Sequence, residues 1–221
     1  MKVKFNKVST AKIAALVDGF ATEVEWHGTV ERTDYGFEIT DIIVFPHEAS
    51  AGSVDSVQKE YEEWLDSLTD KQFSELRFHG HSHVNMPTFV SGKDAKYQSD
   101  MLAGMPKGST DDTFYIFGIF NKQRKYTIIV NDIENDKTYD SNKGEVEVEF
   151  EKAKKIDTLD FLAEAKKLVR TRVYTVSAGK WDEADDYISA LAYQLVFGSK
   201  PEAFDALDEL LYTREVMEET R

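Results

Sequence analysis

Helical and strand-like apolar patterns alternate along residues 1–150, and this alternation restricts the fold more than any other feature of the chain. Apolar residues recur at helical spacing over residues 8–20, whereas over residues 22–45 they interleave with polar residues on either side of a turn signal. Residues 113–120 form a dense apolar run that is typical of a buried strand, and residues 126–130 follow as its partner. The sequence therefore predicts a mixed α/β domain.

Further elements are predicted between and after these segments. They are a helix over residues 53–68, a short helix over 69–76, a strand from Leu76 that ends near His83, a helix over 91–102 and a strand over 145–150. Ser9 or Thr10 can cap the helix over residues 8–20, and residues 104–112 are predicted to form a polar loop.

Strand patterns fade after about residue 150. Helical spacing dominates residues 158–173 and 181–196, and Pro201 stands at a favourable first-turn position for a third helix. We therefore expect a domain over residues 1–150 and a helical C-terminal extension over residues 151–221.

Composition narrows the chemistry that the chain can perform. The 221 residues include no cysteine, so disulfides and thiolate zinc sites are excluded, and any metal must be held by His, Asp or Glu. A net charge of −14 at pH 7 disfavours binding to nucleic-acid phosphates. No apolar run reaches the roughly 18 residues that a membrane span needs, and the basic residues 1–7 do not lead into an apolar stretch. We expect a cytoplasmic protein with neither a signal peptide nor a nucleic-acid or membrane partner.

Three of the five histidines, His79, His81 and His83, stand at alternate positions. Alternate residues of an extended strand point to the same face, so a His-x-His pair can place two imidazole nitrogens on one metal ion. Asp94, at the start of the following helix, is the obvious carboxylate for a third ligand. Two imidazoles, one carboxylate and an open position suit a catalytic zinc site.

His81 also opens a longer pattern, which reads His-x-His, seven residues, Ser91, two residues and Asp94. Upstream, Glu25-Trp-His-Gly28 places Glu-x-x-Gly on an expected strand. In both features the chain resembles the JAB/MPN metalloprotease family with its JAMM motif, and the order of elements agrees over residues 8–131. The chain is most similar to the stand-alone bacterial and phage members of that family.

The resemblance implies a fold, a metal and a reaction. The fold would be α/β, with a mixed, mainly antiparallel sheet flanked by helices, in a layering like that of JAB/MPN domains and cytidine deaminases. His81, His83 and Asp94 would bind Zn²⁺, with a water as the fourth ligand. Glu25 would act as general base and Ser91 would donate a hydrogen bond to the oxyanion, so that a peptide or isopeptide bond is hydrolysed.

The resemblance also implies a partner. The substrate would be a protein or peptide, such as the tail of a ubiquitin-like protein. The alternative is a non-catalytic MPN-type interaction module that docks a protein partner. Such modules usually lack one or more ligands, whereas this chain has all of them.

The Ser91-x-x-Asp94 pair and the choice of histidines each allow a second interpretation. Ser91-x-x-Asp94 is also a capping-box pattern that starts a helix without any catalytic meaning. His79 competes with His83 as the partner of His81, but the spacing to Ser91 favours His83. We expect His79 to support the metal ligands or to have a structural role.

Glu23, His27 and His47 have less support from the motif than the residues named above. Glu23 competes with Glu25 for the role of base, but Glu25 has the glycine at the family's offset, and Glu23 is then expected to be solvated or paired. His27 and His47 are interpreted as ordinary histidines, partly buried or on the surface. Val84 stands where many family members have proline, which bears on the shape of the loop.

Overall fold

The computed structural model describes residues 1–49, 54–55, 58–105, 113–153 and 156–171. The chain divides into two units, Met1–Thr171 and Arg172–Arg221, and the second lies outside the described residues. The helices predicted over residues 181–196 and from Pro201, with most of the predicted loop over residues 104–112, also lie outside them. The helical extension therefore stays a prediction, as does its boundary.

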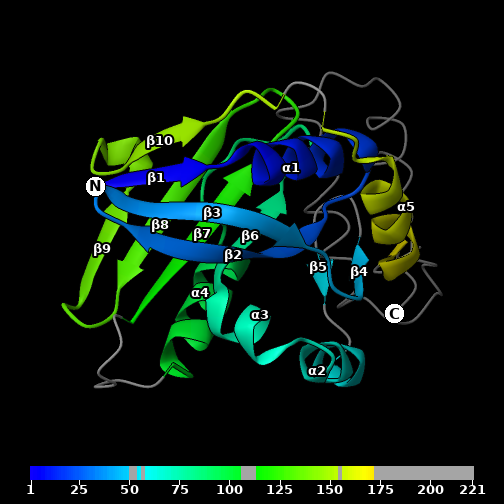
Figure 1. Cartoon of the computed structure of the whole chain (residues 1–221), viewed down its shortest axis with the longest axis horizontal. Coiled ribbons are helices and arrows are strands. Elements are labelled where there is room, and N and C mark those ends of the chain that lie inside the picture. The colour runs from blue at the N-terminus through cyan, green and yellow to red at the C-terminus, as the bar shows by residue number, and fades with distance from the viewer. Residues whose placement is uncertain (50–53, 56–57, 106–112, 154–155, 172–221) are drawn as a thin grey trace, which may run out of the picture. The chain divides into compact units, whose positions relative to one another are not determined.

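The first unit alternates strands and helices, which confirms the α/β class (Figure 1). In chain order its described elements are β1 (Lys2–Phe5), α1 (Lys7–Gly19), β2 (Glu25–Thr33), β3 (Gly36–Ile43), β4 (His47–Ala49), β5 (Val54–Asp55), α2 (Gln58–Asp66), α3 (Asp70–Glu75), β6 (Leu76–Ser82), α4 (Gly92–Ala103), β7 (Phe114–Phe120), β8 (Tyr126–Asp132), β9 (Lys137–Asp140), a 3-10 turn (Ser141–Lys143), β10 (Glu147–Phe150), α5 (Leu159–Leu168) and β11 (Val169–Thr171). None of the helices described is long and apolar enough to cross a membrane.

Most strands join one eight-stranded mixed sheet in the order β10-β1-β3-β2-β6-β7-β8-β9. Antiparallel pairs join β2 to β3 and β6, and β8 to β7 and β9. Parallel pairs join β1 to β3 and β10, and β6 to β7. A smaller sheet has the order β11-β4-β5. The predicted mixed sheet and the hairpin over residues 22–45 are therefore confirmed.

The two faces of the large sheet have different coverings. On one face α1 closes the main core, in which Trp26 and Phe78 are fully buried. On the other face α4 packs against Tyr115 and Phe117 of β7. Side chains alternate along a strand, so the neighbours of Trp26 and Phe78 face α4. The face that α4 covers therefore carries Glu25 and His27 of β2 beside His81 and His79 of β6, paired in that order.

Gly80 of β6 stands where there is no room for a side chain. A Cβ atom at Gly80 would overlap the indole ring of Trp26 on the core face. The position between His79 and His81 therefore needs a residue without a side chain, because the indole fills the space beside the β6 backbone.

Several local predictions need correction. The helix over residues 8–20 begins at Lys7, and its cap is Asn6, whose side chain accepts the Ser9 N–H at 2.9 Å, rather than Ser9 or Thr10. The helix predicted over residues 53–68 is shorter, because Val54–Asp55 form β5 and α2 begins at Gln58. The end of the helix predicted over residues 158–173 is the strand β11. The strands β1, β4 and β9 were not predicted at all.

Candidate metal centre

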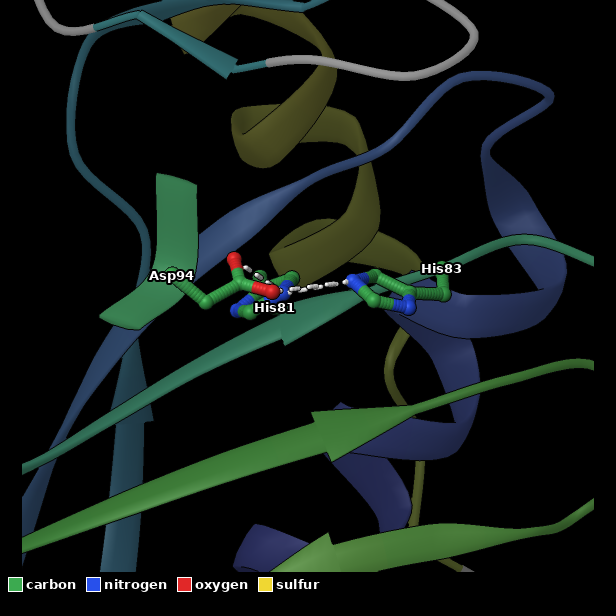
Figure 2. Close-up of side chains that lie close together, drawn as sticks. All are labelled: His81, His83 and Asp94. Carbon is green, nitrogen blue, oxygen red and sulfur yellow. Dashed lines mark hydrogen bonds and ion pairs between the residues drawn. The ribbon is translucent and has the colours of Figure 1, made fainter. Parts of the chain in front are cut away.

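Three side chains from two neighbouring elements converge beside the end of β6. His81 lies in β6, His83 follows its last residue, and Asp94 lies in the first turn of α4. The His81 Nε2 atom is 3.0 Å from His83 Nε2 and 3.2 Å from Asp94 Oδ1, and His83 Nε2 is 3.6 Å from Asp94 Oδ2. Figure 2 shows Asp94 and His83 turned toward His81 from either side. The structure thus brings together the three residues that the motif predicts as ligands.

This donor set suits a metal ion. The three ligand atoms lie within 4.8 Å of one another, and both imidazoles are buried. Two nitrogens and one carboxylate oxygen are the donors that zinc takes in catalytic sites, where a fourth position stays open for water or substrate. The buried group is therefore compatible with a metal, and the chain offers no thiolate that would favour another arrangement.

Ser91 fixes the carboxylate of Asp94 through a reciprocal capping box. The Ser91 Oγ accepts the Asp94 N–H at 3.2 Å, and the Asp94 Oδ2 accepts the Ser91 N–H at 2.7 Å. Both interpretations of this pair are compatible, because the cap of α4 also aims the carboxylate at the histidines. A hydroxyl oxygen that accepts a hydrogen bond still carries its own proton, so Ser91 keeps a donor for another acceptor.

A hydrogen bond at Nδ1 fixes the imidazole ring of His83. Its Nδ1–H donates to the Pro87 carbonyl at 2.7 Å, so Nε2 is the nitrogen that faces His81 and Asp94 and that would bind a metal once deprotonated. Such a bond fixes both the tautomer and the ring orientation of a metal-binding histidine. The turn after His83 makes this contact possible, since Met86 N–H donates to the His83 carbonyl and Asn121 Nδ2 donates to the Met86 carbonyl.

Val84 adopts a strained backbone conformation in this turn. Its φ is +45°, a left-handed region that a β-branched residue rarely occupies, at a cost of roughly 1–2 kcal/mol. We expect Val84→Asn to raise the free energy of unfolding by about 1 kcal/mol, because asparagine tolerates this region. Urea unfolding measures the change. Val84→Ile keeps the branched side chain and should gain nothing, and a less stable asparagine variant would contradict the prediction.

Charge holds the pair of His81 and Asp94 together. Burial opposes the charged form of His81, but the hydrogen bond and negative charge of Asp94 outweigh it and raise the pKa of His81 above its usual 6.5. Burial also opposes ionisation of Asp94, but hydrogen bonds from His81 and His83 hold the pKa of this carboxyl well below its usual range. A bound cation would take over the role that the imidazolium plays beside Asp94.

This pairing makes metal binding dependent on pH. In the metal-free protein the pair stabilises the fold most between pH 3.8 and 6.5, and the part due to His81 is lost as pH rises through its raised pKa. Zinc needs a neutral imidazole, so binding must displace the proton of His81. We expect zinc affinity to weaken as pH falls through the raised pKa of His81, and zinc binding to release protons. Competition with a chromophoric chelator between pH 6 and 8.5 measures both, and a constant affinity would contradict the prediction.

Glu25 lies opposite His81 in the β2–β6 ladder, on the same face of the sheet. Its Oε2 is 3.7 Å from His79 Nε2, and its backbone N–H donates to His47 Nε2 at 3.2 Å. Burial raises the pKa of Glu25, but its interaction with His79 and the charges of His81 and His47 outweigh burial, so the pKa is lowered. Glu25 is therefore a carboxylate at neutral pH, as a general base must be.

Glu23 precedes β2 and is buried, which contradicts the solvated one of the two alternatives, solvated or paired, that were expected for it. Only 6% of its surface is exposed, and burial raises its pKa to about 7 even though His81 and His83 oppose the shift. No feature of the sequence signalled this burial, because the residue lies just before the strand.

The raised pKa of Glu23 makes its ionisation unfavourable to folding. Above pH 4.5 the unfolded chain carries the charge more easily, and this cost grows up to about pH 7 and is then constant. We expect Glu23→Gln to raise the free energy of unfolding of the metal-free protein at pH 8 by about 3 kcal/mol, and to change it little at pH 4. Denaturant unfolding at the two pH values measures the difference. An equal effect at both would contradict the prediction.

His27 and His47 are both buried, which corrects the expectation of partly buried or surface residues. His27 stacks on Trp64 at 5.6 Å between ring centroids and pairs with the Tyr61 hydroxyl at 2.9 Å, so it ties α2 to the sheet. Burial lowers the pKa of His27 to about 3, which keeps it neutral. His47 contacts Glu25, a role that the sequence did not indicate.

Neither the models of known protein families nor the curated proteins match this chain. The JAB/MPN family therefore remains a prediction that rests on the motif and on the geometry described above.

Proposed function

We propose that this protein is a zinc-dependent peptidase or isopeptidase of the JAB/MPN type. The convergence of His81, His83 and Asp94 in a buried group carries the proposal, because the three ligand atoms lie within 4.8 Å of one another. Two further observations support it: Glu25 lies in register with His81, and Ser91 caps the helix that presents Asp94. The JAB/MPN layering of the sheet belongs to the same proposal, supported by helices on both faces of a mixed sheet.

The residues of the chain have separate tasks in this reaction. Bound zinc would lower the pKa of water toward about 7 and polarise the carbonyl that is attacked. Glu25 accepts the proton of the attacking water and delivers it to the leaving amine nitrogen. Ser91 donates its hydroxyl proton in a hydrogen bond to the developing oxyanion. His81, His83 and Asp94 hold the ion in a water-poor setting, since both imidazoles are buried.

The substrate is inferred from the reaction. A peptide carbonyl must reach a centre whose two imidazoles are buried, and an extended chain segment suits this better than a folded surface. We infer a flexible protein segment, such as the tail of a ubiquitin-like protein, as the substrate.

Metal content and metal-dependent cleavage test the proposal. Elemental mass spectrometry of the full chain should find about one zinc per chain. Hydrolysis in a screen of peptides and isopeptide-linked conjugates should vanish on chelation and return with zinc. A protein that retains no zinc after reconstitution and dialysis would refute the hydrolase. Zinc without cleavage of any substrate would favour the non-catalytic interaction module.

A further inference from the structure

We propose that His79 and His47 are positioning residues for Glu25: His79 sets the direction of its carboxylate, and His47 holds its backbone in place. The contacts exist in the fold itself, whereas their catalytic meaning rests on the proposed role of Glu25 as general base. Neither histidine belongs to the motif, and neither lies in the group of possible metal ligands.

His79 approaches the carboxylate of Glu25. It is 3% exposed, and its ring packs against Tyr97 at 4.6 Å and Phe117 at 6.2 Å between centroids. Its Nε2 atom is buried without a hydrogen-bond partner and lies 3.7 Å from Glu25 Oε2. Leaving a buried polar atom unpaired is costly, and a shift of less than about 1 Å would complete a hydrogen bond to the carboxylate. Contacts of this kind are often long before substrate binds and tighten afterwards.

His47 holds the backbone of Glu25. The Nδ1–H of His47 donates to the Phe45 carbonyl at 2.8 Å, which leaves Nε2 as the acceptor for the Glu25 N–H at 3.2 Å. The β2–β3 ladder starts only at His27, so the imidazole takes the place of a strand neighbour at Glu25. His47 is fully buried, and its backbone is held in the small sheet because β4 pairs with β11.

A purely structural role makes a different prediction for each histidine. If His79 only fills space, phenylalanine should replace it without effect on Glu25. If it orients the carboxylate, the donor matters and glutamine should serve better than phenylalanine. For His47 the test is whether the Glu25 amide exchanges its hydrogen with solvent faster when the His47 imidazole, its acceptor, is removed.

The first measurement does not depend on any substrate. In the zinc-loaded full chain, the imidazole ¹⁵N and ¹H signals of His79 should shift on Glu25→Gln and stay in place on Glu23→Gln, a matched control at a nearby buried carboxylate. Hydrogen exchange at the Glu25 amide should speed up at least tenfold in His47→Phe and stay unchanged in His27→Phe. If the chemical shifts of His79 do not change in Glu25→Gln, the contact of His79 with Glu25 is overturned. If the exchange rate of the Glu25 amide does not change in His47→Phe, the contact of His47 with Glu25 is overturned.

The second measurement uses hydrolysis. His79→Phe should lower kcat by about 10- to 100-fold with KM and zinc content unchanged, because a misdirected base impairs chemistry and not binding. His79→Gln should recover most of the loss. An unchanged kcat in His79→Phe would overturn the positioning role. Should the wild type cleave nothing, the proposed function fails while the spectroscopic result still decides whether His79 and His47 hold Glu25.

Discussion

Replacing Glu25 with glutamine is expected to lower the rate of hydrolysis at least about 100-fold while the protein keeps its zinc and its fold. Glutamine has nearly the same shape, but its amide cannot accept a proton from water at neutral pH. General-base catalysis contributes about 10²- to 10⁴-fold, so kcat should fall by that amount. The backbone bond to His47 does not involve the side chain and should survive. Steady-state kinetics, elemental analysis and urea unfolding on the same preparation measure the three properties.

Glu23→Gln is the matched control for this variant. Both carboxylates are close to the histidines, but only Glu25 pairs with His81 in the ladder and approaches His79. The Glu23 variant should therefore keep its hydrolytic activity. An active Glu25→Gln protein together with an inactive Glu23→Gln protein would show that the two carboxylates have the opposite roles.

The candidate ligands could be predicted from the sequence because their geometry is local. His81 and His83 are two residues apart where an extended segment ends, so their side chains point to the same side, and a helix N-cap at Ser91 fixes Asp94 three residues later. The hairpin over residues 22–45 is local in the same sense, since a turn signal separates two alternating runs. Short-range periodicity is sufficient for features of this kind.

The support of Glu25 could not be predicted, because it depends on contacts between distant segments. His47 reaches Glu25 across 22 residues of chain, from a three-residue strand that is held by pairing with Val169–Thr171. Spacing places His79 on the correct face, but it cannot say which atom its Nε2 approaches. The edge pairing of Lys2 with Glu147 was missed for the same reason, because a four-residue strand has no pattern of its own.

His81→Ala is expected to remove zinc from the protein. The variant loses the nitrogen that lies closest to both other donors, 3.0 Å from His83 and 3.2 Å from Asp94. Loss of a supporting residue costs roughly 10- to 100-fold in metal affinity, so loss of a ligand should cost more. Elemental mass spectrometry after dialysis measures the content, and His27→Gln, which changes a buried histidine outside the donor group, should retain its zinc.

Stability gives an independent readout of the same variant. Zinc at 100 times its Kd should stabilise the wild type by about 2.7 kcal/mol, and it should leave His81→Ala unchanged. The wild type should stay folded after chelation, because the core around Trp26 and Phe78 lies on the opposite face of the sheet and needs no metal. Unfolding on chelation would mean a structural ion instead of a catalytic one. Zinc that persists in His81→Ala would place the ion elsewhere, and the convergence of His81, His83 and Asp94 would then lose its meaning as a metal centre.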